Sequence, residues 1–327
     1  MKILVTGGAG FIGSHLVEKL KTMNHEVAIL DKLTYAADLD FIRNLDNVVL
    51  YKGDIADRKF VMDTFSNFKP DHVIHLAAES HVDNSIANPA VFIETNIVGT
   101  MNLLDAFKLV CMGSNRFHHV STDEVYGHLE IGERPFTEKT PYDPRSPYSA
   151  SKAASDMLVR AYVNTYGINA VITNCSNNFG TRQHDEKLIP TVVRNLWGRT
   201  PIPVYGKGEN IRDWLFVEDH VDAIIKVLFE GRKGETYNVG GKRELRNIDL
   251  IKKICTYFDS FFVQNLNSFE ELVTFVDDRA GHDFRYSIDP SKIENELDWH
   301  PHDKPVDFDS NLYNTVKWYY EKYNRNK

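Results

Sequence analysis

The chain has 327 residues, which is long enough for a large hydrophobic core and for two lobes. Hydrophobic residues make up 42% and charged residues 26%, as is ordinary for a globular protein. The formal net charge of −8, with no basic stripe along the sequence, argues against nucleic acid as a partner.

Cysteine content and apolar runs predict where the protein works. Cys111, Cys175 and Cys255 are far apart in sequence and match neither a disulfide framework nor a zinc-binding spacing, so we expect reduced thiols and no metal site. No apolar run approaches the roughly 20 residues that cross a bilayer, and the N-terminus has no signal-peptide layout. We therefore expect a cytoplasmic protein that does not contact a membrane.

Strand and helix patterns alternate along the first half of the chain. Residues 2–6 form an apolar strand, a glycine-rich turn follows, and Ile12, Leu16 and Leu20 mark one face of a helix. The further predicted elements are strands at 26–30, 48–51, 72–76, 117–120 and 169–173, and helices at 60–68, 89–110 and 147–166. This alternation predicts an α/β fold with a doubly wound, parallel, Rossmann-type sheet.

After about residue 176 glycine and proline become frequent and the regular alternation stops. We assign residues 1–175 to a dinucleotide-binding domain and residues 176–327 to a smaller, mixed α/β lobe that binds substrate. The helices predicted in this lobe lie at 189–197, 217–229, 247–257 and 312–323. We expect the chain to return to the first domain near residues 211–240.

The turn after the first strand carries Gly7, Gly10 and Gly13, and Gly8-x-Gly10-x-x-Gly13 also fits the dinucleotide fingerprint. Glycines there allow a pyrophosphate to approach the backbone at a helix N-terminus. Asp31 closes the second strand, 18 residues beyond Gly13, where its carboxylate can bind ribose hydroxyls and would repel a 2′-phosphate. The sequence therefore predicts NAD, in preference to NADP, as the cofactor.

Residues that follow the other strands complete the predicted cofactor site. Asp54-Ile55 and Leu76-Ala77-Ala78 are placed to flank the adenine and the diphosphate, although core packing explains the alanine pair equally well. The predicted set also contains the neighbours of these motifs, Phe11, Ile12, Lys32, Leu33 and Thr34.

Thr122, Asp123 and Glu124 follow the strand at 117–120, where ligands bind in open parallel sheets. Placing two adjacent carboxylates near a core costs free energy, so we expect them to have a catalytic function. The alternative is that they only cap the next turn. Tyr148 and Lys152 lie four residues apart, on one face of a helix. Such a pair alone is typical of a solvated surface, but beside a dinucleotide fold we expect the ammonium to lower the pKa of the phenol and make it a base.

Together these motifs resemble the extended short-chain dehydrogenase/reductase family, in its branch of nucleotide-sugar 4,6-dehydratases. The resemblance runs from residue 1 to about residue 300 and rests on the segments TGGAGFIGS, LAAESHVDNSI, STDEVYG, YSASKAASD, NNFG, EKLIP, RDWLFVEDH and DRAGHD. It implies tightly held NAD and a nucleotide-sugar substrate, with dTDP-glucose expected and UDP-glucose left open. It also implies a homodimer paired through the helices near residues 95–110 and 148–166.

The resemblance also implies a role for each residue of the strand end and the helix. Tyr148, tuned by Lys152, takes the proton of the sugar 4-hydroxyl, Thr122 hydrogen-bonds that oxygen, and hydride passes from C4 to NAD. Glu124 then removes the C5 proton, Asp123 protonates the departing 6-hydroxyl, and hydride returns to C6. A neutral Asp beside an ionised Glu requires split pKa values, which the repulsion between two crowded carboxylates favours.

By the same resemblance, Thr95 and Asn178 join Tyr148 and Lys152 around the nicotinamide and its ribose, and Ser80 is also among the cofactor contacts. The implied substrate contacts are Ser80, Thr122, Asn177, Lys187, Leu188, Pro203, Tyr205, Arg212, Asn247, Arg279 and His282. Arg212 and Arg279 suit a diphosphate, because guanidinium groups bind phosphate bidentately. His282 could equally be a hydrogen-bonded structural histidine, and we interpret His300 and His302 as surface residues.

Two departures from the family pattern, Thr181-Arg182-Gln183-His184-Asp185 and Ala280, bear on base preference more than on reaction type. A nucleotide-sugar 4-epimerase or a uronate decarboxylase would use Thr122, Tyr148 and Lys152 but would need no acid at Asp123. A non-catalytic NAD-binding sensor typically lacks the Tyr or the Lys. The adjacent acids therefore favour the dehydratase among these alternatives.

Overall fold

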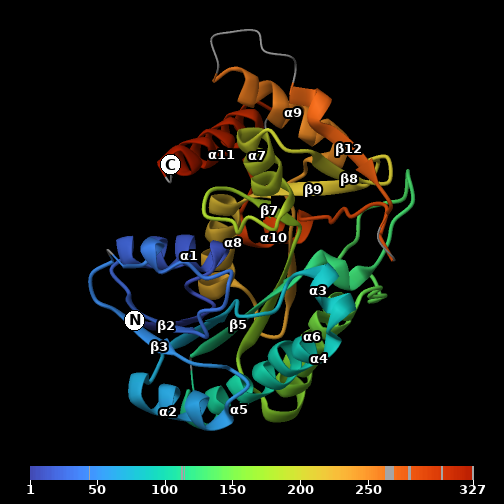
Figure 1. Ribbon diagram of the computed structural model, residues 1–327. Helices are drawn as coiled ribbons and strands as arrows, with labels where there is room; N and C mark the ends of the chain where they lie inside the picture. The colour runs from blue at the N-terminus through green and yellow to red at the C-terminus, as the bar shows by residue number, and fades with distance from the viewer. Residues whose placement is uncertain are drawn as a thin grey trace.

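The computed structural model of the protein describes residues 1–43, 45–111, 113, 115–261, 269–278, 281–302 and 305–325. A seven-stranded parallel sheet in the order β10-β6-β5-β4-β1-β2-β3 forms its centre (Figure 1). The strands are β1 (Lys2–Thr6), β2 (Glu26–Asp31), β3 (Val48–Lys52), β4 (His72–His75), β5 (Arg116–Thr122), β6 (Ala170–Cys175) and β10 (Thr236–Val239). The strand order reverses between β1 and β4, so their carboxyl ends form the switch point where such sheets bind ligands.

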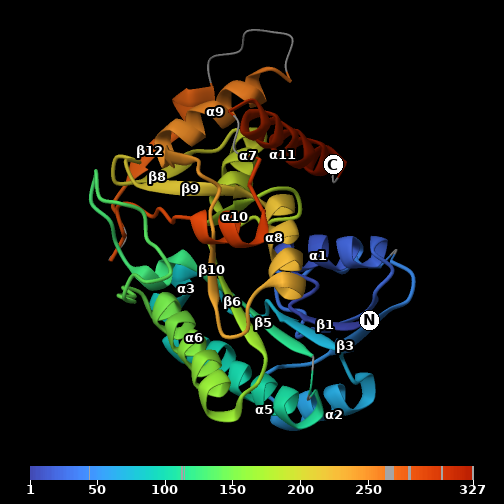
Figure 2. The same ribbon diagram turned by 180° about the vertical axis from the view of Figure 1, so that it is seen from behind.

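Helices cover both faces of this sheet, as the two opposite views show (Figures 1 and 2). Helices α1 (Phe11–Thr22) and α8 (Val217–Glu230) pack side by side on one face. Helices α2 (Arg58–Phe68), α5 (Thr100–Val110) and α6 (Pro147–Tyr166) pack together on the other. Strands covered on both faces need continuous apolar runs, and β1, β2 and β6 are buried almost throughout. The predicted doubly wound α/β fold is confirmed.

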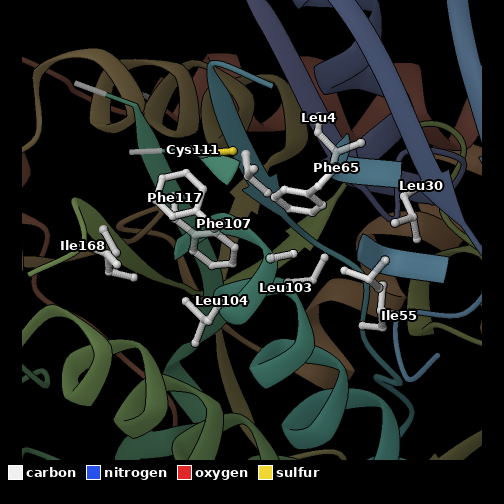
Figure 3. Packing of buried hydrophobic residues seen from close by; sticks show 14 of the residues in the cluster. Leu4, Leu30, Ile55, Phe65, Leu103, Leu104, Phe107, Cys111, Phe117 and Ile168 are labelled. Atoms are coloured by element: carbon white, nitrogen blue, oxygen red, sulfur yellow. The ribbon is translucent and has the colours of Figure 1, made fainter. Parts of the chain in front are cut away.

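The apolar core between the sheet and helices α2, α5 and α6 fixes the position of these helices. Phe107 of α5 packs against Phe117 of β5 with ring centroids 5.6 Å apart at an angle of 70°, and Phe65 of α2 belongs to the same cluster (Figure 3). Edge-to-face aromatic pairs of this kind contribute about 0.5–1.5 kcal/mol beyond the burial of their area. The core thus holds the helices rigidly against the strands whose ends carry polar side chains.

The helix predicted at residues 89–110 has three parts in the structure. These are α4 (Pro89–Phe92), a π-helical segment (Ile93–Gly99) and α5. Isolated π-helical turns are frequent at functional sites, and Thr95 lies in this one. The neighbouring Asn96 bonds both backbone groups of Glu79 and donates to the hydroxyl of Ser151 at 2.8 Å, which ties the segment to α6.

A second lobe lies above the sheet in the view of Figure 1. It contains a three-stranded sheet in the order β11-β9-β7 and the parallel pair β8–β12. Its elements are β7 (Asn177–Phe179), β8 (Ile202–Tyr205), β9 (Ile211–Phe216), β11 (Glu244–Arg246), β12 (Val273–Val276), α7 (Leu188–Gly198), α9 (Asn247–Asp259) and α11 (Pro305–Arg325). The sequence predicted its helices but not its strands, because most of these strands are too short to show a period.

Two further short helices are α3 (Val82–Ala87) and α10 (Ser291–Leu297), and α10 packs against β10 and α8. Between β9 and β11 the chain returns to the central sheet, where α8 covers one face and β10 pairs with β6. Within the described part of the chain, no helix combines the length and the apolarity needed to span a membrane.

Candidate active site

A cavity of about 340 Å³ lies along the carboxyl ends of β1, β2, β4 and β5. The predicted cofactor residues that line it are Gly7, Gly10, Phe11, Ile12, Gly13, Asp31, Lys32, Thr34, Asp54, Ile55, Leu76, Ala77, Ala78, Ser80, Thr95, Tyr148, Lys152 and Asn178. Thr122, Asp123, Glu124, Asn177 and Lys187 line the same cavity. The structure thus brings the glycine loop, the paired carboxylates and the Tyr–Lys pair to one site.

The glycine loop forms a backbone cradle that side chains would fill. Gly7 has a φ of +73°, and a Cβ there would lie 2.7 Å from the backbone nitrogen of Ala77. A Cβ at Gly13 would overlap the carbonyl oxygen of Gly7 and lie 2.8 Å from the Cα of Gly8. The loop leads into the N-terminus of α1, where Ser14 donates its N–H to the carbonyl of Gly10 at 2.9 Å. This geometry fits a dinucleotide pyrophosphate.

Asp31 connects the glycine loop with the end of β2. Its Oδ2 accepts the N–H of Ala9 at 3.0 Å and its Oδ1 accepts the N–H of Leu33 at 2.8 Å. Burial raises the pKa of Asp31, although these two hydrogen bonds oppose the rise. Each oxygen keeps a lone pair for a ribose hydroxyl. Beside it, the ammonium of Lys32 lies 2.5 Å from the carboxylate of Asp54.

Leu33, which the sequence analysis assigned to the cofactor contacts, does not line the cavity. Its side chain packs against the apolar cluster formed by β1, β2, α1 and α8. Its backbone N–H bonds the carboxylate of Asp31.

Thr122, the last residue of β5, begins the 3₁₀ turn Asp123–Tyr126 that presents the paired carboxylates. Its hydroxyl accepts the N–H of Glu124 and donates to Oδ1 of Asp123, both at 3.3 Å. Asp123 is 2% exposed, and its Oδ2 has no hydrogen-bond partner among the described residues. Burial raises the pKa of Asp123 well above its usual range, and the charges of Glu124 and Asp213 raise it further. Both influences favour the protonated form of the Asp123 carboxyl group.

Helix α6 brings Tyr148 and Lys152 against β5. The helix spans the predicted residues 147–166 and ends at Gly167, whose φ is +68°. It begins at a capping box formed by Ser146 and Ser149. The Nζ of Lys152 donates to the carbonyl oxygen of Val120 at 2.9 Å, and both Tyr148 and Lys152 are buried. Burial lowers the pKa of Lys152, while the charge of Asp156 raises it.

The prediction of a lowered pKa for Tyr148 is wrong for this structure. Burial raises the pKa of the phenol well above its ordinary value, and the charge of Glu124 adds to the effect. The hydrogen bond to Thr122 acts in the opposite direction but is the smaller influence. A buried phenol next to a carboxylate needs a further positive charge before it can act as a base.

Several predicted substrate contacts lie outside the cavity: Leu188, Pro203, Tyr205, Arg212, Asn247 and His282. The guanidinium of Arg212 donates to the backbone oxygens of Ile211 and Asp283 at 2.7 and 2.9 Å and lies 4.3 Å from the ring centroid of Tyr286. It therefore joins segments of the second lobe to each other. Arg279 and Ala280 lie outside the described residues.

Tyr205 and His282 form a second polar group in the same lobe. Their rings meet edge to face at 6.0 Å, the hydroxyl of Tyr205 lies 3.5 Å from Asp83, and Nδ1 of His282 lies 2.6 Å from Asp278. This pairing fits the alternative interpretation of His282 as a structural histidine. Pro203 is exposed on β8, and Leu188 packs in the core of the second lobe.

Sequence reasoning did not assign Gln183, His184 and Glu186 to the site, yet all three line the cavity. They belong to or adjoin the departing segment Thr181–Asp185, and this position between two family motifs was the available signal. Arg182 bonds Glu18 of α1 at 2.6 Å, and His15 lies 3.1 Å from the carbonyl of Thr181. The departing residues thus connect the second lobe to the helix behind the glycine loop.

Within the described ranges, no group of three or more His, Cys, Asp or Glu could hold a metal ion. The sheet order and the glycine cradle place the chain among Rossmann-type dinucleotide-binding proteins, and the Tyr148–Lys152 pair narrows this class to the short-chain dehydrogenases/reductases. The family model described as GDP-mannose 4,6 dehydratase matches residues 4–310, and the chain belongs to this family.

Relatives with known activities share nearly the whole chain. The dTDP-glucose 4,6-dehydratase of Haemophilus influenzae is 50% identical to it over 98% of both chains. The dTDP-glucose 4,6-dehydratase DesIV of Streptomyces venezuelae, solved with NAD bound, is 43% identical with a TM-score of 0.90 over 98% of this chain and 97% of its own. The UDP-glucose 4-epimerase of Thermus thermophilus, in complex with NAD, is 29% identical with a TM-score of 0.87 over 98% of this chain and 99% of its own.

Proposed function

We propose that the protein is a dTDP-glucose 4,6-dehydratase that uses tightly held NAD and releases water and dTDP-4-keto-6-deoxyglucose. One observation carries the proposal: the buried acid Asp123 and its neighbour Glu124 line the same cavity as Tyr148 and Lys152. The 50% identity to a dTDP-glucose 4,6-dehydratase supports the choice of substrate.

The first 175 residues, together with α8 and β10, hold the cofactor in this proposal, and the remainder holds the sugar nucleotide. The cradle of Gly7 and Gly13 receives the diphosphate, and Asp31 receives the adenosine ribose. When bound, NAD would supply a hydride acceptor, the returning hydride and, in its oxidised form, a positive charge that favours ionised Tyr148. Ser80, Asn177 and Lys187 line the cavity, and in this proposal they contact the substrate.

Tyr148 takes the proton of the sugar 4-hydroxyl in the oxidation step. The hydroxyl of Thr122 donates to the carboxyl group of Asp123 and accepts the backbone N–H of Glu124. In this proposal it also holds the oxygen that becomes the ketone. Lys152 is anchored to the carbonyl of Val120 and presents a fixed positive charge to the phenolate. The three groups act on one sugar carbon.

Asp123 and Glu124 carry out the elimination. The 4-ketone acidifies the C5 proton, Glu124 removes it, and Asp123 gives its proton to the 6-hydroxyl, which leaves as water. As C6 receives the returning hydride, Glu124 would give its proton back to C5 and complete the 6-deoxy product. The raised pKa of Asp123 favours the protonated acid that the elimination step requires. A 4-epimerase built on the same scaffold has no use for this acid, which favours the dehydratase.

Incubation of the purified protein with dTDP-glucose tests the function. We expect a dTDP-4-keto-6-deoxy sugar, detected by the alkaline absorbance of the keto sugar and by mass spectrometry. An unchanged sugar, with NAD bound to the protein, contradicts the proposal, and a 4-epimer would assign the epimerase instead. Equal amounts of dTDP-glucose and UDP-glucose in one reaction test the base preference, with dTDP-glucose expected to be consumed first.

We also propose a homodimer in the cytoplasm. Ile93 and Val98 of the π-helical segment and Met157 of α6 are large exposed apolar side chains on elements that pack against each other. Light scattering should give twice the mass of one chain.

The cytoplasmic location is supported by the three cysteines, which are free and buried as in a reducing compartment.

A further inference from the structure

Asp156 is a buried carboxylate to which the mechanism above gives no role. It follows Tyr148 and Lys152 on α6 at the same spacing of four residues, so all three lie on one face of the helix. Its exposed fraction is 0%. A carboxylate is costly to bury at such a position unless it is paired or hydrogen-bonded.

The carboxylate of Asp156 connects α6 with the strand end that carries Thr122. Its Oδ2 accepts the hydroxyl of Tyr142 at 2.8 Å and the amide of Asn174 at 3.4 Å, and its Oδ1 lies 3.1 Å from Nε2 of His119. The same amide of Asn174 donates to the carbonyl oxygen of Thr122 at 3.0 Å. A single side chain therefore bridges the helix of the Tyr–Lys pair and strands β5 and β6.

The groups that face Lys152 come from four elements: His75 of β4, His119 of β5, Cys175 of β6 and Asp156 of α6 itself. Burial lowers the pKa of both histidines, that of His119 to about 4, and raises the pKa of the Cys175 thiol to about 12. Burial also acts to raise the pKa of Asp156, but His119 and Lys152 outweigh it and hold the pKa below its usual value. Of these four groups, Asp156 alone is charged at neutral pH.

We propose that Asp156 is a positioning residue for the dehydratase, whose carboxylate keeps the ammonium of Lys152 protonated and holds the Thr122 strand end in register with α6. The inference rests on the proposed function, because it assigns Asp156 to the oxidation step. The Cβ atoms of residues one helical turn apart are about 5–6 Å from each other. At such a distance a unit charge in a partly screened interior shifts the pKa of its neighbour by roughly 1–2 units.

The test compares Asp156→Asn with Tyr142→Phe. The first substitution removes the charge, and the second removes one hydrogen bond to the same carboxylate and leaves the charge in place. The measurement is the pH dependence of the first step, followed as reduced nicotinamide formed after mixing the NAD-loaded enzyme with dTDP-glucose. Thermal unfolding of each variant verifies that it is folded.

We expect the alkaline limb of the Asp156→Asn profile to move to lower pH by about 1–2 units, with activity recovering as the pH is lowered. The Tyr142→Phe profile should keep its midpoint. A folded Asp156→Asn protein that loses activity equally at every pH, or none at all, overturns the proposal. If this variant does not fold, Asp156→Glu is tested in its place. A midpoint of its alkaline limb within about half a pH unit of the wild type supports the role of the charge. A larger shift of that midpoint opposes it. A wild-type protein that forms neither reduced nicotinamide nor keto sugar overturns the proposed function and, with it, the role of Asp156.

Discussion

Replacement of Asp123 by asparagine should separate oxidation from elimination. The substitution removes the acidic proton but keeps the size and shape of a side chain that is 2% exposed. The amide oxygen can still accept the hydroxyl of Thr122, which bonds Oδ1 at 3.3 Å in the wild type. The fold and the Tyr148–Lys152 pair should therefore be preserved.

The expected magnitude follows from the role of Asp123 as proton donor. Loss of a positioned general acid slows a step by about 10²–10⁴-fold, equivalent to about 2.7–5.4 kcal/mol in the activation free energy. Because Thr122, Tyr148 and Lys152 are unchanged, oxidation at C4 should stay within about tenfold of the wild-type rate. Reduced nicotinamide should then accumulate, because its reoxidation has to wait for the elimination.

Rapid mixing of the NAD-loaded variant with dTDP-glucose provides the assay, with the absorbance of reduced nicotinamide and the keto sugar followed together. Glu124→Gln is the matched control, because it removes the base of the same elimination and should also leave reduced nicotinamide on the enzyme. If Asp123→Asn forms no reduced nicotinamide while remaining folded, Asp123 also serves oxidation and the division of roles is wrong. Product formation at the wild-type rate would equally refute its role as acid.

Tyr148→Phe should abolish the formation of reduced nicotinamide itself, while the melting temperature stays close to that of the wild type; substantial reduction of NAD by this variant would exclude Tyr148 as the base. Gly13→Ala places a Cβ against the backbone of the glycine loop and should lower the free energy of unfolding by about 1–3 kcal/mol in denaturant titrations. Gly10→Ala is the control, because its Cβ would meet one carbonyl oxygen at 3.3 Å, and it should lower the free energy of unfolding by less. The hydrogen bond to Asp219 raises the pKa of His302, so this contact stabilises the fold fully below about pH 6.5 and is lost as the pH rises through the raised pKa. As the pH rises above about 6.5, the melting temperature of the wild type should therefore fall more steeply than that of His302→Gln. If the two melting temperatures change in parallel with pH, the contact does not contribute to stability.

The central sheet was predictable because its strands and helices carry long, regular patterns. The helix at residues 147–166 matches its predicted bounds, since Pro147 and Gly167 are strong start and stop signals. The seventh strand, β10, was missed because four residues show no period and its partner β6 lies more than sixty positions earlier. Pairing between distant segments depends on the tertiary structure, which local patterns do not contain.

The candidate site was predicted in part: the residues of local motifs could be read from the sequence, and contacts that depend on the tertiary structure could not. Residues at strand ends and in the glycine loop reach the cavity because the sheet topology places them there. Arg212 and Tyr205 belong to the second lobe and do not line the cavity. Arg212 donates to a backbone oxygen of Asp283, and Tyr205 contacts Asp83. The pKa of Tyr148 was assigned in the wrong direction because the sequence shows the cation at Lys152 but not the extent of burial.

Burial also explains how two adjacent carboxylates can take opposite roles. Thr122 caps the 3₁₀ turn, which directs Asp123 into the protein interior and leaves Glu124 only partly buried at the cavity wall. The charge of Glu124 then raises the pKa of Asp123 and favours the protonated form of that acid. Since the UDP-glucose 4-epimerase of Thermus thermophilus shares the scaffold at a TM-score of 0.87, the fold alone leaves the reaction open. Under the proposed function the reaction is decided at this turn, where the adjacent residues Asp123 and Glu124 serve as proton donor and base.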